Sequence, residues 1–88
     1  IMDRIEEPRL GRYRHFKGKE YEVIAVARNC DDPERKVVVY RALYNHEEFG
    51  EGSVWERSLE EFVGENDLGA GGMVKRFEFV GEMEDGKT

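Results

Sequence analysis

The side chains best suited to chemistry are few: two histidines, one cysteine and a single tryptophan. His15 alternates with arginines in the stretch around Tyr13, and this period of two predicts a half-buried strand with the imidazole on its inner side. Such a histidine is suited either to bonding a tyrosine hydroxyl or a backbone carbonyl, or to lying at the floor of a ligand groove. His46 lies in a polar segment, which indicates a solvated side chain.

Cys30 is followed by acidic residues, and negative charge disfavours the thiolate that nucleophilic catalysis requires. One cysteine and two distant histidines also lack the close ligand spacing of a zinc site. The glycine-rich stretch at residues 69–75 lacks the spacing of a phosphate-binding loop, and a strand is expected after it in place of a helix. We therefore expect a protein that is not an enzyme and that uses no cofactor and no metal.

Aromatic residues accompany an arginine beside the tryptophan, a combination that peptide and ligand grooves use. The competing interpretation is structural, because a small barrel must fill its interior with rings. The residues predicted to bind a ligand at the rim are Tyr13, His15, Tyr44, Trp55 and Arg57. We expect this rim to recognise a peptide or protein segment, with Arg57 pairing an acidic or carboxylate group.

The basic segment at residues 9–19 offers an alternative function, nucleic-acid binding. It holds five bases, one histidine and no acid, and its candidate phosphate contacts are Arg12, Arg14, Lys17 and Lys19. The whole chain carries a net charge of −6, which opposes attraction to a polyanion. Nucleic acid is therefore the weaker of the two candidate partners.

The elements that must position these residues are predicted to be short strands. Runs rich in β-branched and aromatic residues alternate with turn residues, as expected of a small antiparallel barrel. Five strands are expected, at residues 11–16, 21–28, 35–44, 54–57 and 75–82. With one short helical turn before the last strand, this all-β order is typical of a five-stranded SH3-like antiparallel barrel.

The helical turn is predicted from a capping box, in which Ser58 is followed three residues later by Glu61. Gly64 follows so soon that a single turn is expected. Residues 64–74 contain four glycines and are expected to form a loop.

The solvent side of the predicted strands carries more apolar side chains than a bare surface should. They are Ile24, Val26, Val37, Val39 and Leu43. Patches of this kind usually mark contacts. Three explanations stay open: an N-terminal segment with Ile5 and Leu10 covers the patch, bent strands bury both of their faces, or the patch mediates a homodimer or binds a partner.

The 88 residues are expected to form one SH3-like barrel domain at residues 11–82, with an N-terminal segment at 1–10 and a flexible tail at 83–88. A single cysteine cannot form an intramolecular disulfide, which favours a reducing compartment and a cytoplasmic protein. No run approaches the ~20 apolar residues of a membrane span, so we expect no membrane association.

Residues spread over most of the chain also carry a resemblance to a known family. The matching pieces are residues 13–18, Tyr21 with Val23, residues 38–40 and 43–44, and then Trp55, Arg57 and Phe62. Together they resemble the short bacterial proteins catalogued as domain of unknown function 1653. The chain departs from that pattern at Ser58, where the family usually has proline. The resemblance implies a small SH3-like barrel and implies no activity.

Overall fold

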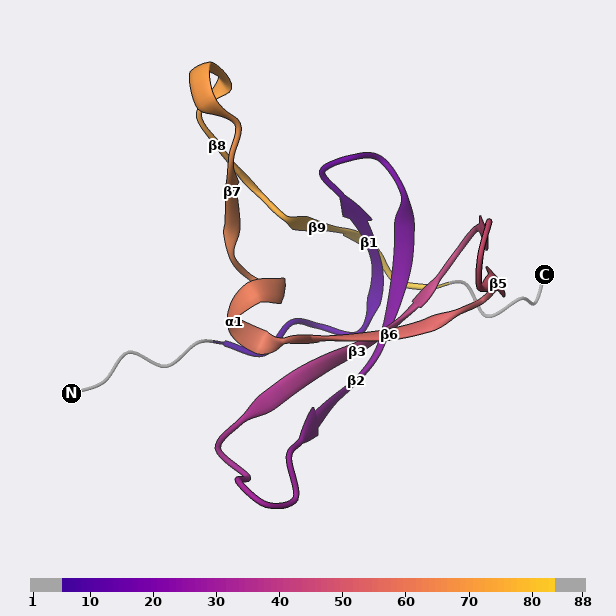
Figure 1. The fold of residues 1–88 in the computed structure, drawn as a ribbon, viewed down its shortest axis with the longest axis vertical. Helices are drawn as coiled ribbons and strands as arrows, with labels where there is room; N and C mark the ends of the chain where they lie inside the picture. The colour runs from indigo at the N-terminus through magenta and orange to yellow at the C-terminus, as the bar shows by residue number, and fades with distance from the viewer. Residues whose placement is uncertain (1–5, 84–88) are drawn as a thin grey trace.

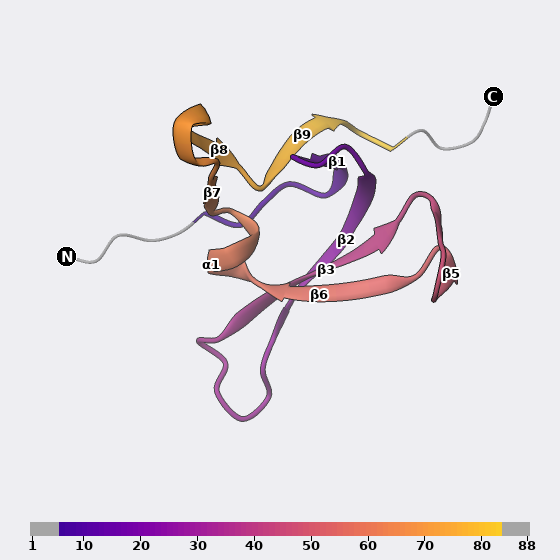
Figure 2. The same ribbon diagram turned by 45° about the horizontal axis from the view of Figure 1, so that its top comes forward.

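The computed structural model describes residues 6–83. Its largest element is a five-stranded antiparallel sheet in the order β6-β3-β2-β1-β9. These strands are β1 (Gly11–His15), β2 (Glu20–Arg28), β3 (Lys36–Ala42), β6 (Val54–Ser58) and β9 (Phe77–Gly81). Figures 1 and 2 show that the sheet is strongly curved. The remaining elements are β4 (Asn45–His46), β5 (Gly50–Glu51), α1 (Leu59–Phe62), β7 (Glu65–Asp67), η1 (Gly69–Gly71) and β8 (Met73–Lys75).

The register of the sheet gathers aromatic side chains on one face. Tyr13 of β1 lies opposite Tyr21 of β2, and Tyr40 of β3 lies opposite both Val23 and Trp55 of its neighbours. Residues directly opposite each other in an antiparallel pair project to the same side. We call this side, which carries these five residues, the inner face, and it agrees with the alternation predicted for β1 and β3.

An irregularity in β2 reverses that alternation halfway along the strand. The register with β3 shifts between Val23 and Ala25, so that Ile24 is an extra residue. The prediction that Val26 faces solvent is therefore wrong, because Val26 packs against the core while Ala25 is exposed. One inserted residue moves every later side chain to the opposite face.

The core lies where α1 meets the inner face. Phe62 is 1% exposed and stacks on Phe77, with ring centroids 4.2 Å apart and planes within 8°. The rings of Tyr13 and Tyr40 lie 5.4 and 5.5 Å from Phe62. Leu59 is also buried, so a four-residue helix supplies two anchors of the core.

The predicted capping box forms. Ser58 is the N-cap of α1, and its hydroxyl oxygen accepts a hydrogen bond from the Glu61 N–H at 3.2 Å. This bond satisfies a donor that the first turn of a helix leaves free. The predicted single helical turn before the last sheet strand is therefore confirmed.

The expected closed barrel is not found within the described part of the chain, residues 6–83. The edge strands β6 and β9 do not pair with each other. Instead α1 packs beside β3 and β6, as Figure 2 shows. The sheet is thus open, and a helical turn lies where strand pairing would have closed it.

The glycine-rich stretch after α1 differs from the prediction. Where a loop was expected, β7 and β8 form a hairpin around η1, which projects from the sheet in Figure 1. Gly69 and Gly72 have φ values of 69° and 85°, a conformation that favours glycine. The last sheet strand begins at Phe77, two residues after the predicted start. Two further predictions, for Ile5 and for the tail beyond Met83, fall outside the described residues.

Candidate functional site

Partly exposed rings form a continuous band on the inner face, which we call the aromatic strip. It consists of His15, Tyr21, Tyr44, His46, Trp55 and Phe49. The buried ring of Phe77 links its first members, with centroids 5.0 Å from His15 and 5.8 Å from Tyr21. Tyr44 follows at 5.5 Å from Tyr21, and His46 at 6.1 Å from Tyr44. Three strands and the β4–β5 hairpin therefore contribute to one surface.

The β4–β5 hairpin completes the far end of the strip. The rings of Trp55 and His46 lie 5.4 Å apart, and Phe49 lies 5.3 Å from Trp55. His46 was predicted to be solvated, and this was wrong. It is partly buried between these rings, and its Nδ1 accepts hydrogen bonds from the N–H groups of Glu48 and Phe49 at 3.0 and 3.2 Å.

His15 is half-buried at the near end of the strip, on the predicted side of β1. Its Nδ1 accepts a hydrogen bond from the backbone N–H of Lys17 at 3.1 Å, which places the proton of the neutral ring on Nε2. Burial, together with Arg57, Arg76 and Lys17, lowers the pKa of His15. The imidazole is therefore held neutral among cations.

Arg57 projects from β6 onto the same end. Its Nε–H donates to the Tyr40 hydroxyl at 3.3 Å, and its Cζ lies 6.0 Å from the centroid of Phe77. Among residues 6–83 the guanidinium contacts one carboxylate, that of Glu61, at 3.9 Å. A long contact to an exposed carboxylate is weak, so Arg57 retains capacity for a further anion.

The tyrosine hydroxyls of the strip are paired with each other. The hydroxyls of Tyr21 and Tyr44 lie 2.8 Å apart, in a bond that either oxygen can donate. Burial, and then this bond, raise the pKa of Tyr21. The Lys19 ammonium lies 4.5 Å from the Tyr44 centroid, a cation–π distance. The hydroxyl of Tyr21 is therefore held protonated, and the paired hydroxyls lie where a ligand can bond them.

Tyr13 was predicted at the rim, but it lies in the core. It is 6% exposed, its ring meets Phe62 and Phe79 edge-on, and its hydroxyl donates to the Arg9 carbonyl at 2.8 Å. The alternation that placed Tyr13 and His15 on one side was right. The alternation could not predict that α1 covers Tyr13 and leaves His15 partly exposed.

The cations of the two faces differ in whether they are paired. On the outer face Arg12 and Arg14 both contact Glu20, at 3.7 and 2.9 Å, and Arg41 contacts Glu22 at 3.4 Å. Near the aromatic strip the cations are Lys17, Lys19, Arg57 and Arg76, which we call the cation group. Within the residues that the structure describes, Lys17, Lys19 and Arg76 form no ion pair.

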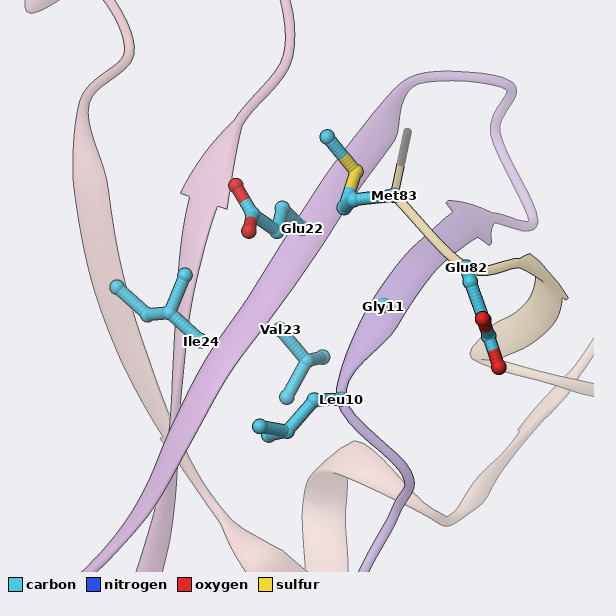
Figure 3. A pocket seen from close by; sticks show the side chains of 7 residues that line it. All are labelled: Leu10, Gly11, Glu22, Val23, Ile24, Glu82 and Met83. Atoms are coloured by element: carbon cyan, nitrogen blue, oxygen red, sulfur yellow. The ribbon is translucent and has the colours of Figure 1, made fainter. Parts of the chain in front are cut away.

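A separate pocket of about 320 Å³, shown in Figure 3, has no residue of the aromatic strip in its lining. Leu10, Ile24 and Met83 provide its apolar walls. Its two carboxylates already have cationic partners, because Glu22 contacts Arg41 and Glu82 contacts Arg9. None of the predicted site residues lines it.

The predicted outer apolar patch is present in part. Val37 and Val39 are half-buried on the outer side of β3, whereas Leu43 is exposed. Ile24 shares the pocket with Leu10, so the N-terminal segment reaches the edge of this patch. The register shift in β2 also removes Val26 from this patch, because it turns that side chain to the core.

No cluster of three histidine, cysteine or acidic side chains suited to a metal occurs between residues 6 and 83. Cys30 is exposed, and its sulfur lies 3.9 Å from Asp31 Oδ1. No helix in this same part of the chain is long and apolar enough to cross a membrane.

The fold and site define a small, mainly β protein with a five-stranded antiparallel sheet and a ring-lined inner face. Residues 11–79 match the family model described as a protein of unknown function, DUF1653. The chain therefore belongs to the DUF1653 family, as the sequence resemblance indicated. A similar solved structure is the crystal structure of a DUF1653 protein from Bordetella bronchiseptica, with 32% identity and a TM-score of 0.74, covering 92% of this chain and 97% of that one. No curated protein matches the chain.

Sequence reasoning missed His46, Phe49 and Arg76 as members of the site, and it counted Tyr21 among the aromatic residues without placing it at the rim. The signal for two of them lay in the segment between Tyr44 and Trp55. There His46 and Phe49 flank two acids before Gly50, which has a φ of 86° suited to a tight turn. A hairpin at that position would have folded both rings back toward Trp55.

Proposed function

We propose that the protein is a non-catalytic binding module that recognises an acidic peptide or protein segment on the aromatic strip. A carboxylate of the ligand pairs with Arg57 beside neutral His15, and apolar ligand side chains pack on Trp55 and Phe49. Tyr44 and Tyr21 supply hydroxyls at the centre of the strip. Rings that offer area at small entropic cost, combined with an arginine, are what such sites use.

The observation that carries this proposal is the contrast between paired and unpaired cations. A chain with a net charge of −6 has acids to spare, and its outer-face arginines use them. The cation group, by comparison, contacts one exposed carboxylate within the described part of the chain, that of Glu61, and the distance is 3.9 Å. Positive potential on one ring-lined surface of an acidic protein favours an acidic partner.

The nucleic-acid alternative gains less support from the same charges. Of its four predicted contacts, Arg12 and Arg14 share the carboxylate of Glu20 on the outer face. Lys17 and Lys19 lie at the β1–β2 turn, so the basic segment does not present one continuous line of charge. A single-stranded oligonucleotide is the probe for this alternative, and binding that falls steeply with salt and is lost on neutralising both lysines would establish it.

The test is a selection from a random peptide library displayed on phage, followed by affinity measurements on the selected peptides. We expect acidic peptides to be enriched. Arg57→Ala should weaken them about tenfold or more, because a bond between charged groups is worth roughly 1.5–3 kcal/mol. Trp55→Ala should weaken them by a comparable factor.

Arg41→Ala is the matched control, since it removes the same charge from the outer face of the sheet. It should leave the affinity within about twofold. Equal losses for Arg41→Ala and Arg57→Ala would reduce the effect to net charge and contradict the proposal. A library that yields no binding peptide would contradict it as well.

We propose two further features of the molecule. The curved sheet with α1 is a variant of an SH3-like barrel, supported by the strand order and by Phe62 lying between strands of the sheet. A bacterial cytoplasm is its setting, supported by the free and exposed thiol of Cys30. Localisation of the tagged protein tests the second feature, and the stability measurement on Phe62 described below tests the first.

A further inference from the structure

The free edge of β6 adjoins the aromatic strip. The Ala42 N–H donates to the Ser53 carbonyl at 2.7 Å, and this pair continues the β3–β6 register. Hydrogen-bonded pairs alternate along an antiparallel ladder. Trp55 therefore directs its backbone groups toward β3, whereas Val54 and Glu56 direct theirs away from the sheet.

Those outward backbone groups are open to a ligand. Val54 is 53% exposed and Glu56 is also exposed. No loop, turn or cap bond in the part of the chain that the structure describes involves either residue. An edge strand with free N–H and C=O groups is a template for a further strand.

The opposite edge of the sheet lacks this combination. The Arg9 guanidinium lies 4.3 Å from the centroid of Phe79 on β9, and the Tyr13 hydroxyl holds the Arg9 carbonyl at 2.8 Å. The N-terminal segment thus occupies the inner face beside β9. Of the two edges of the five-stranded sheet, as far as residues 6–83 show, the edge at β6 is the one that lies beside both the rings of the strip and Arg57 of the cation group.

We infer that the acidic ligand binds as an additional strand on β6, with its main chain bonded to Val54 and Glu56. This inference rests on the proposed function and specifies its geometry. Trp55 and Arg57 are two residues apart and both face the strip, so alternate side chains of an added strand lie over them. The ligand should therefore carry an apolar and an acidic residue separated by one position.

The charge of the site selects this occupant. An extended peptide places an acid beside Arg57, and among the described residues the neighbouring cations Lys17, Lys19 and Arg76 form no ion pair that the ligand would have to displace. A second copy of β6 would instead add another arginine to a surface that is already cationic. The competing role for Arg57 is to prevent strand pairing, because inward-pointing charges protect sheet edges. The experiment below distinguishes that role from binding of a ligand carboxylate.

The experiment uses the peptides selected above, with the full chain. Their sequences should share the pattern of an acidic and an apolar residue with one residue between. The best peptide is then made in two versions, N-methylated on alternate backbone nitrogens. One version should bind about tenfold or more weakly and the other within about threefold, because one set of amides faces β6.

Variants of the protein test the same edge from the other side. Glu56→Pro removes an outward N–H without entering the ladder to β3, and it should weaken binding about tenfold, whereas Glu56→Ala should stay within about threefold. Bound peptide should also slow amide hydrogen exchange at Val54 and Glu56. If Glu56→Pro does not fold, the exchange data and the two methylated peptides decide.

The outcomes distinguish this inference from the proposed function. Two results would overturn strand addition and leave the proposed function standing. In the first, the peptides require Arg57 but tolerate methylation on both sets of amides. In the second, the selected peptides show the three- and four-residue spacing of a helix. Unchanged exchange at Val54 and Glu56 with peptide bound would do the same. Failure to select any peptide overturns both.

Discussion

Phe62 offers the sharpest test of how α1 completes the fold. Its side chain is 1% exposed, stacks on Phe77 at 4.2 Å and contacts the rings of Tyr13 and Tyr40. Replacing a buried phenylalanine with alanine costs about 3–5 kcal/mol, and aromatic pairs add about 0.5–1.5 kcal/mol each beyond burial. We therefore expect Phe62→Ala to lose about 4 kcal/mol of unfolding free energy.

That loss is large for a chain of 88 residues. Typical stability is roughly 0.05–0.15 kcal/mol per residue, which gives a total of about 4–13 kcal/mol. At about 4–8 °C per kcal/mol, the midpoint of thermal unfolding should fall by roughly 15–30 °C. The loss of unfolding free energy is measured by urea unfolding, with Trp55 fluorescence and near-ultraviolet circular dichroism as the two signals.

The control is Val63→Ala, at a position that directly follows α1 and is 37% exposed. It should cost about 0.5 kcal/mol or less. If Phe62→Ala does not fold, Phe62→Leu should still cost about 1–2 kcal/mol. A loss at Phe62 no greater than that at Val63 would refute the view that α1 closes the core, and with it the proposed SH3-like arrangement.

Two further predictions concern the protonation of His15 and the N-cap of α1. Because burial and the cations around it lower the pKa of His15 below its ordinary 6.5, the unfolded chain binds a proton more readily than the folded one. The free energy of unfolding should therefore fall as the pH drops below about 6.5. Urea unfolding at several pH values measures this dependence, and His15→Gln should make it weaker. An unchanged dependence on pH would contradict the lowered pKa of His15. Ser58→Ala should lower the free energy of unfolding by about 1 kcal/mol because it removes the N-cap of α1. Ser58→Asp should keep most of that stability, since aspartate is also a good N-cap. Equal stability of all three proteins in thermal unfolding would show that the cap is dispensable.

The sequence predicted the regular parts of this fold because their signals are local. Alternation around Tyr13 located β1, a β-branched run located β3, and the spacing of Ser58 and Glu61 located α1. The shift at Ile24 has no such signal, since a bulge adds one residue without changing composition. It was this shift that turned Val26 from the outer face to the core.

The candidate site was harder to predict because it depends on long-range contacts. Tyr13 is less exposed than His15 because Phe62 and Phe79, both far along the chain, pack against its ring. Likewise, polar composition at residues 45–53 indicated a solvated loop, whereas the β4–β5 hairpin places His46 against Trp55. The pairing of Arg12 and Arg14 with Glu20 followed from hairpin register, which composition does not fix.

The central claim is that an acidic peptide lies on the aromatic strip. The most direct measurement is a titration of isotope-labelled protein with a selected peptide, followed by nuclear magnetic resonance. The single tryptophan gives one indole signal, from the Trp55 Nε1–H that donates to Ser53 Oγ at 3.0 Å. We predict that this signal and the amide signal of Arg57 shift in saturable fashion. Shifts confined to the outer pocket around Ile24, with the indole signal unmoved, would contradict the account.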